Sequence, residues 1–254
     1  RIVSSCVIIT GMHRSGTSLF THYLSKSGIE LGDQLLSPDR GNPKGYFEDK
    51  NIVELHNDIL RANGFHYLFN IKKLPTLDID EKYKKRASKI VLQKGDCSSM
   101  WGWKDPRTSI LLNFWQKILP NGTKYIFLFR HPISVCDSLI RRDTDEMIKK
   151  EPVIGLKSWN IYNRKILSFL SNGQKDALLI NIDSFLENEK KYRKIINKKI
   201  GINITNKSNK IIDKKLIKKE SAIKTWHMMK LKHPILYINA MYIYNKMYNY
   251  ELIK

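Results

Sequence analysis

The sequence has few cysteines and no long apolar run. Its three cysteines, Cys6, Cys97 and Cys136, show no paired spacing and no accompanying histidine cluster, so neither a disulfide framework nor a zinc site is indicated. A reducing compartment, and hence a cytoplasmic location, is expected. The most apolar long stretch, 234–250, is interrupted by Asn239, Asn245 and Lys246, so we expect no transmembrane segment.

Acidic residues are scarce relative to basic ones. The chain has 24 Asp and Glu against 45 Lys and Arg, a formal net charge of +21, which suggests a partner carrying phosphate, sulfate or carboxylate. Most of the basic residues are lysines, and isoleucine and asparagine are also abundant, a combination typical of compositional bias. Residues 189–232 alone contribute +12 of the excess. The net charge is therefore weak evidence for a function.

Short β-branched runs alternate with segments of helical spacing. Strands are predicted at 3–10, 99–104, 124–130 and 177–182. Helices are predicted at about 17–27, 51–62, 81–94, 109–118, 132–142 and 151–171, with one or two more in 226–250. This alternation predicts a P-loop-like, three-layer α/β domain with a central, mostly parallel sheet flanked by helices. We expect this domain to span 1–220 and a C-terminal helical extension to span 221–254.

The segment Gly11-Met12-His13-Arg14-Ser15-Gly16-Thr17-Ser18 joins the first predicted strand to the first helix. Free backbone N–H groups and the helix dipole make such a junction an anion cradle. Nucleotide triphosphatases carry Lys where this loop has Thr17, so magnesium-dependent hydrolysis of ATP or GTP is disfavoured. A cation lies inside the loop instead, at Arg14, and could pair with a phosphate oxygen. We favour this interpretation over a plain glycine turn with a solvent-facing arginine. The residues expected at the anion are His13, Arg14, Ser15, Gly16, Thr17 and Ser18.

A second anion site is predicted after the strand at 124–130. Arg130 ends that strand at the carboxyl edge, where doubly wound sheets bind ligands. Ser138 and Arg142 are four residues apart on the next helix, so all three side chains could converge on a phosphate. Taken alone, Arg142 could equally be a solvated charge. Two anion sites at one sheet edge suit a nucleotide with phosphates at both ends of its ribose.

These two motifs resemble those of the sulfotransferases that use 3′-phosphoadenosine 5′-phosphosulfate. In that family an Arg- or Lys-Ser-Gly-Thr loop binds the 5′-phosphosulfate, and an Arg followed eight residues later by Ser binds the 3′-phosphate. Both patterns are present, as Arg14-Ser15-Gly16-Thr17 and as Arg130 with Ser138. Three further segments are similar to the bacterial branch: Gly41-Asn42-Pro43-Lys44-Gly45-Tyr46-Phe47-Glu48, Trp103-Lys104-Asp105-Pro106-Arg107 and Ile211-Ile212-Asp213-Lys214-Lys215-Leu216.

The resemblance covers about residues 3–220 and is closer to the carbohydrate and tyrosylprotein sulfotransferases than to the cytosolic small-phenol enzymes, whose C-terminal Arg-Lys-Gly motif is not evident. It implies 3′-phosphoadenosine 5′-phosphosulfate as donor, 3′,5′-adenosine bisphosphate as product and no metal. It also implies a hydroxyl-bearing acceptor, either a small molecule or a glycan.

Transfer by in-line displacement requires a base for the acceptor hydroxyl and cations around the sulfuryl group and the leaving phosphate. Arg14 suits the leaving phosphate, and the resemblance supports Lys104 at the sulfuryl group, although Lys104 could simply pair with Asp105. Glu48 is our first choice for the base, because it closes a Gly/Pro-rich loop before a helix. A helix-entry role for Glu48 is equally supported. Other candidates for the base are Glu30, Asp33 and His13.

Several aromatic residues could line an acceptor pocket, although packing is the better expectation for most of them. They are Tyr46, Phe47, Phe65, Tyr67 and Trp103. Trp159 and Tyr162 share one helix face, and we expect them in the core.

Two other functions stay open. One is a P-loop kinase-like phosphotransferase using ATP and magnesium, with Asp105 as the metal carboxylate. The other is a basic nucleic-acid-binding protein, although 189–232 lacks the interleaved glycines and stacking aromatics of such segments.

Overall fold

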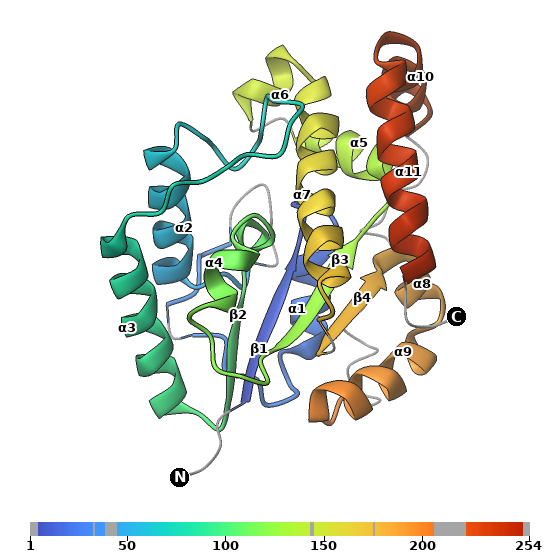
Figure 1. Ribbon diagram of the computed structural model, residues 1–254. Coiled ribbons are helices and arrows are strands. Elements are labelled where there is room, and N and C mark those ends of the chain that lie inside the picture. Colours follow the sequence, from blue (N-terminus) through green and yellow to red (C-terminus); the bar gives the residue numbers. More distant parts are fainter. Residues whose placement is uncertain are drawn as a thin grey trace.

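The structure, a computed structural model, describes residues 5–32, 34–38, 45–142, 145–174, 176–205 and 222–250. Four parallel strands form one sheet in the order β2-β1-β3-β4 (Figure 1). Their bounds are β1, Ser5–Gly11; β2, Met100–Lys104; β3, Lys124–Phe129; and β4, Ala177–Asn181. Parallel neighbours need long crossover connections, which the helices supply. The predicted α/β class and parallel sheet are confirmed.

Most of the predicted helices are present with nearly the predicted bounds. The helices before β3 are α1, Thr17–Leu24; α2, Lys50–Ala62; α3, Glu81–Cys97; the 3₁₀ turn η1, Pro106–Ser109; and α4, Leu112–Gln116. Those after it are α5, Pro132–Arg142; α6, Glu146–Lys150; α7, Val153–Ser171; α8, Ile182–Glu187; α9, Glu189–Ile196; the π turn η2, Asn197–Gly201; α10, Ala222–Lys232; and α11, Pro234–Tyr250.

The differences from the predicted elements concern short segments. The single helix predicted at 109–118 is instead η1 followed by α4, because the Asp105 side chain caps a tight turn by accepting from the Arg107 N–H. Helices α6, α8 and α9 were not predicted. Each spans at most eight residues, too few to display a distinct period of 3.6 residues.

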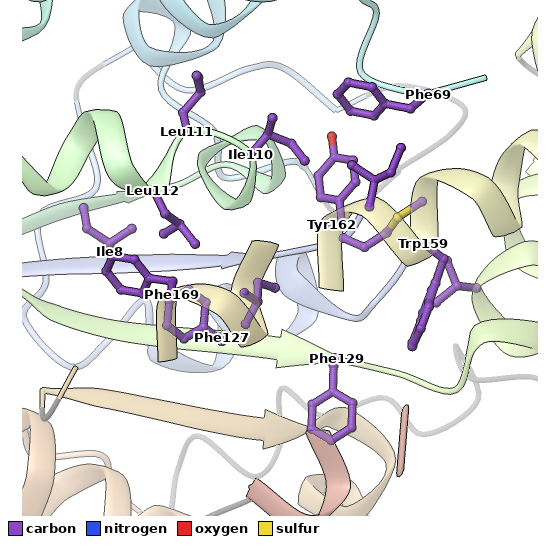
Figure 2. Packing of buried hydrophobic residues seen from close by; sticks show 14 of the residues in the cluster. Ile8, Phe69, Ile110, Leu111, Leu112, Phe127, Phe129, Trp159, Tyr162 and Phe169 are labelled. Carbon is purple, nitrogen blue, oxygen red and sulfur yellow. The ribbon is translucent and has the colours of Figure 1, made fainter. Parts of the chain in front are cut away.

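The sheet is covered on both faces, and alternate strand residues enter two separate cores. Residues such as Ile8 and Phe127 point to the side of α2, α4, α5 and α7, whereas Ile9 and Ile126 point to the side of α1, α8 and α9. This alternation follows from the two-residue period of a strand. Figure 2 shows the first core, where Phe127 lies against Phe169 of α7.

One glycine allows the two strands β1 and β2 to pair. A Cβ atom on Gly102 would lie 1.8 Å from the backbone oxygen of Val7 in β1. Any side chain at this position would push the two strands apart.

The C-terminal residues form two helices that pack on the main domain. Helix α11 runs along α7 (Figure 1), and the Asn160 side chain donates to the Leu236 backbone oxygen at 3.3 Å. Met229, Ile243 and Met247 belong to the same core cluster as α7. The domain boundary predicted after residue 220 lies outside the described residues. Within the described ranges, none of the helices combines the length and hydropathy needed to cross a bilayer.

Candidate active site

The predicted functional residues follow the carboxyl ends of neighbouring strands. Because all four strands are parallel, these ends meet at one edge of the sheet, with Ile9 paired to Lys104 and Phe129 paired to Asn181. The chain passes from β1 to β2 on one side and then to β3 on the other. The loops after β1 and β3 therefore flank a topological switch point, where open α/β sheets bind ligands.

The loop after β1 has the backbone of an anion cradle. Arg14 adopts a left-handed conformation with φ 67°, and Gly16, with φ 81°, precedes α1 without any side-chain cap on the helix. No side chain caps the first N–H groups of α1, and N–H groups at a helix N-terminus favour an anion. A Cβ atom on Gly16 would lie 2.5 Å from Cγ1 of Ile182 at the start of α8, so glycine is required there. The Ser15 hydroxyl is buried and has no hydrogen-bond partner among the described residues.

The two predicted anion motifs are joined by a hydrogen bond. Nε of Arg14 donates to Oγ of Ser138 on α5 at 2.9 Å, and one turn further along α5 Arg142 donates to the Tyr46 hydroxyl at 2.5 Å. Burial and, next, the charge of Arg142 lower the pKa of Arg14. The structure therefore brings Arg14, Ser138 and Arg142 together, in an arrangement of like charges that an anion would relieve.

Arg130 lies at the same edge of the sheet, but its ion-pair partner is Asp183 of α8. Its side chain is buried, and its Nε lies 3.4 Å from Oδ1 of Asp183 on α8. Trp159 of α7 fixes its backbone by donating to the Arg130 oxygen at 3.1 Å. Asp183 carries no sequence motif, and no signal pointed to it. Arg130 Nε makes no hydrogen bond within the described part of the chain, so its contact with Asp183 is an ion pair without a hydrogen bond.

The predicted base and the predicted second cation form a buried ion pair. Lys104 donates to Oε1 of Glu48 at 2.7 Å and to the Ser18 hydroxyl at 3.2 Å. The helix-entry role considered for Glu48 is performed by Asp49, which accepts hydrogen bonds from the first N–H groups of α2. Lys104 pairs with Glu48 and not with Asp105. The side chain of Glu48 is thus directed toward the cations of the site.

Asp105 is the centre of a second buried network of hydrogen bonds and ion pairs, next to the Lys104–Glu48 pair. Its carboxylate accepts from Nδ1 of His56 at 3.1 Å and from Arg107 at 3.0 Å, and Arg107 in turn lies 3.5 Å from Oε2 of Glu48. Burial alone would raise the pKa of Asp105, but Arg107 and His56 outweigh it and hold the pKa well below its usual range. Trp115 donates to Nε2 of His56 at 2.8 Å, so the ring proton lies on Nδ1.

His56 was missed by the sequence reasoning. It occupies the core-facing side of α2, beside the buried Ile52 and Ile59. A polar residue at such a position needs a partner, and this was the only available signal. The partner, Asp105, is 49 residues away in the chain.

His13 lies at the cradle between two tyrosine rings. Its ring centroid is 4.6 Å from that of Tyr67 and 5.8 Å from that of Tyr162. Burial and, next, the charge of Arg107 hold the pKa of His13 well below 6.5. Nε2 of His13 has no hydrogen-bond partner among the described residues, so a neutral imidazole is left to contact a ligand.

This lowered pKa makes stability depend on pH. Below about pH 6.5 the unfolded chain takes up a proton at His13 that the folded chain does not, so the free energy of unfolding falls by up to about 1.4 kcal/mol per pH unit. His13→Gln is therefore expected to lose less stability than the wild type between neutral pH and about pH 5.5. Urea denaturation at both pH values measures this difference, with the exposed His227→Gln as control. An unchanged pH dependence in His13→Gln would contradict the assignment.

The other candidates lie elsewhere or are already engaged. The Glu30 carboxylate accepts a hydrogen bond from the Gly32 N–H at 3.0 Å. The Glu30 backbone forms a β-bridge with Trp101 near the start of β2, away from the carboxyl edge of the sheet. Asp33 lies outside the described residues. Trp159 and Tyr162 are buried, as predicted, and so is Trp103.

Two solved structures with a similar fold are sulfotransferase domains. The sulfotransferase domain from the Synechococcus PCC 7002 olefin synthase matches with a TM-score of 0.58 and 16% sequence identity, over 96% of this chain and 94% of that chain. The sulfotransferase domain from the curacin biosynthetic pathway matches with a TM-score of 0.53 and 16% identity, over 83% of this chain and 78% of that chain. No protein-family model and no curated protein matches the sequence.

Proposed function

We propose that this protein is a sulfotransferase that moves the sulfuryl group of 3′-phosphoadenosine 5′-phosphosulfate to the hydroxyl of a carbohydrate or a related metabolite, releasing 3′,5′-adenosine bisphosphate. The observation that carries the proposal is the Arg14–Ser138 hydrogen bond. It joins two anion motifs at the sheet edge where the Lys104–Glu48 pair also lies. The shared fold supports the same class of reaction, and a cytoplasmic location is part of the proposal.

The donor groups at this edge match the charges of the nucleotide. The loop amides, the buried Ser15 hydroxyl and Arg14 suit the 5′-phosphosulfate, while Arg130, Ser138 and Arg142 suit the 3′-phosphate. When bound, the donor supplies a sulfuryl group already activated by a phosphate leaving group. We assign no metal to this chemistry.

The proposed roles balance protons and electrons. The acceptor hydroxyl loses its proton to Glu48 while its oxygen forms the new bond to sulfur. The bond between sulfur and the phosphate oxygen breaks, and its electron pair leaves on the bisphosphate, where Arg14 and the loop amides neutralise the charge. Lys104 holds Glu48 on one side, and Arg107, fixed by Asp105, holds it on the other.

The kinase-like alternative would use Asp105 as a magnesium ligand. Both carboxylate oxygens of Asp105 already accept hydrogen bonds. Oδ1 accepts from the Arg107 backbone N–H, and Oδ2 accepts from His56 and from the Arg107 guanidinium. This arrangement favours a positioning role for Asp105.

Ligand binding tests the proposal directly. At about one hundred times its dissociation constant, 3′,5′-adenosine bisphosphate without metal should stabilise the fold by about 2.7 kcal/mol, measured as a shift in thermal unfolding. ATP with magnesium and a DNA duplex are the parallel arms. Stabilisation by ATP with magnesium but not by the bisphosphate would refute the proposal, and stabilisation by DNA alone would support the nucleic-acid alternative. A mass-spectrometric screen for sulfate gain would then identify the acceptor.

The 3′-phosphate assignment is tested with Arg130→Ala. Loss of a charge-assisted hydrogen bond of about 1.5 to 3 kcal/mol should weaken bisphosphate binding by about 10- to 150-fold. Binding of adenosine 5′-monophosphate, which lacks the 3′-phosphate, should change much less. Titration calorimetry measures both, with Arg61→Ala, an exposed arginine on α2, as control. Equal losses for the two nucleotides would show that Arg130 does not bind the 3′-phosphate.

A further inference from the structure

Helices α10 and α11 carry an exposed apolar stripe away from the candidate site. Leu231, Ile235, Ile238 and Tyr242 are 74%, 78%, 63% and 59% exposed. Within α11, spacings of three and four residues place Ile235, Ile238 and Tyr242 along one side of the helix. Leu231 lies near the end of α10, three residues before α11 begins. The opposite side of α11 is buried against the domain through residues such as Ile243. The exposed residues of α11 therefore face outward from a packed helix, and a cluster of exposed large apolar side chains marks an interaction site.

The two helices that carry the stripe have charged side chains of one sign. Residues 222–250 contain four lysines and neither Asp nor Glu. Lys230 and Lys232 are exposed at the end of α10, next to Leu231. Lys246 lies over the Tyr242 ring at 4.7 Å. An occupant that accepts aliphatic side chains and carries negative charge around them would complement both features of these helices.

We propose that this surface, made of the stripe and its flanking lysines, docks onto an anionic lipid bilayer. Aliphatic side chains enter the boundary between headgroups and acyl chains, lysines pair with anionic headgroups, and tyrosine suits the interface between them. A nucleic acid would satisfy the lysines but would leave the isoleucines in water. A second copy of this chain, placed stripe to stripe, would bring lysines of like charge together.

The docking surface is fixed relative to the carboxyl edge of the sheet. The Tyr244 ring of α11 packs on Phe129 at 5.8 Å and on His131 at 5.0 Å, on either side of Arg130. Docking would thus place the candidate site at a constant distance from the bilayer. The proposal does not depend on the proposed function, and its test requires no turnover.

Vesicle sedimentation of the full chain tests docking. We expect binding to vesicles of phosphatidylcholine with one quarter phosphatidylserine, and much weaker binding to pure phosphatidylcholine, at physiological salt. The double variant Ile235→Ser, Ile238→Ser should lower the partition coefficient about 100-fold, because two aliphatic side chains no longer leave water. Lys230→Gln with Lys232→Gln should lower it about tenfold or more on the anionic vesicles.

Matched controls separate this surface from the general basicity of the chain. Leu92, 68% exposed on α3, is the apolar control as Leu92→Ser, and Lys85→Gln with Lys89→Gln on the same helix is the charge control. Both controls should bind as the wild type does. Absence of wild-type binding, or equal losses in the controls, would overturn the proposal. A dimer in sedimentation equilibrium that disappears in the Ile235→Ser, Ile238→Ser variant would instead assign the stripe to contact between copies.

Discussion

Replacing Glu48 by glutamine is expected to lower kcat for sulfuryl transfer by about two to four orders of magnitude, the usual contribution of a general base. Glutamine keeps the size of the side chain and still offers an oxygen to Lys104, which now donates to Oε1 of Glu48 at 2.7 Å. It cannot take the acceptor proton. Single-turnover measurement of sulfate transfer, at saturating donor, gives the rate of the chemical step.

The control for this substitution is Glu54→Gln on the exposed side of α2, where the carboxylate pairs with Arg86 at 3.4 Å. It should leave kcat unchanged. The affinity of Glu48→Gln for 3′,5′-adenosine bisphosphate should also stay within about threefold of the wild type, less than 1 kcal/mol. A fall in kcat of less than about tenfold would remove Glu48 from the role of base. A matching loss of nucleotide affinity would point to disruption of the Lys104 pair instead.

Gly102→Ala is expected to lower the free energy of unfolding by about 3 kcal/mol or more. The new Cβ would stand 1.8 Å from the Val7 backbone oxygen. Val7 belongs to β1, which is held between β2 and β3 and has little freedom to move aside. Either β1 and β2 separate or their ladder distorts, and β1 is the strand that leads into the anion loop. Urea denaturation measures the change, and an unchanged m-value would attribute it to stability rather than to a different denatured state.

Gly155→Ala on α7 is the matched control. Its Cβ would lie 3.3 Å from a terminal side-chain atom of Leu139, which can shift, and alanine favours a helix by up to about 1 kcal/mol. The control should therefore stay within about 1 kcal/mol of the wild type. If Gly102→Ala were equally mild, the tight approach of β1 and β2 would not be a constraint on the fold.

Features encoded in short stretches of sequence were predictable. The strand that precedes Arg130 and the loop that contains Arg14 are each specified by neighbouring residues, through β-branched runs and a glycine turn. The contact between Arg14 and Ser138 spans 124 residues, and no local pattern encodes it. Both motifs were predicted, but their hydrogen bond was not.

The buried ion pairs illustrate the same limit. Lys104 and Glu48 were each placed at the site, while the obvious local partner of Lys104 was the adjacent Asp105. In the structure Asp105 forms ion pairs with His56 and Arg107. Lys104 instead forms its ion pair with Glu48. Such choices depend on competition among several charged groups in a low-dielectric interior, and this competition appears only once helices and strands are packed.

The residues that follow β4 contact both halves of the proposed nucleotide site. Ile182 fills the space that a side chain on Gly16 would need, and the next residue, Asp183, pairs with Arg130. Both sit on the turn that Asn181 caps with its own side chain. A change in this three-residue segment would disturb both Gly16 and Arg130, so the two proposed anion positions depend on a segment that carries neither motif.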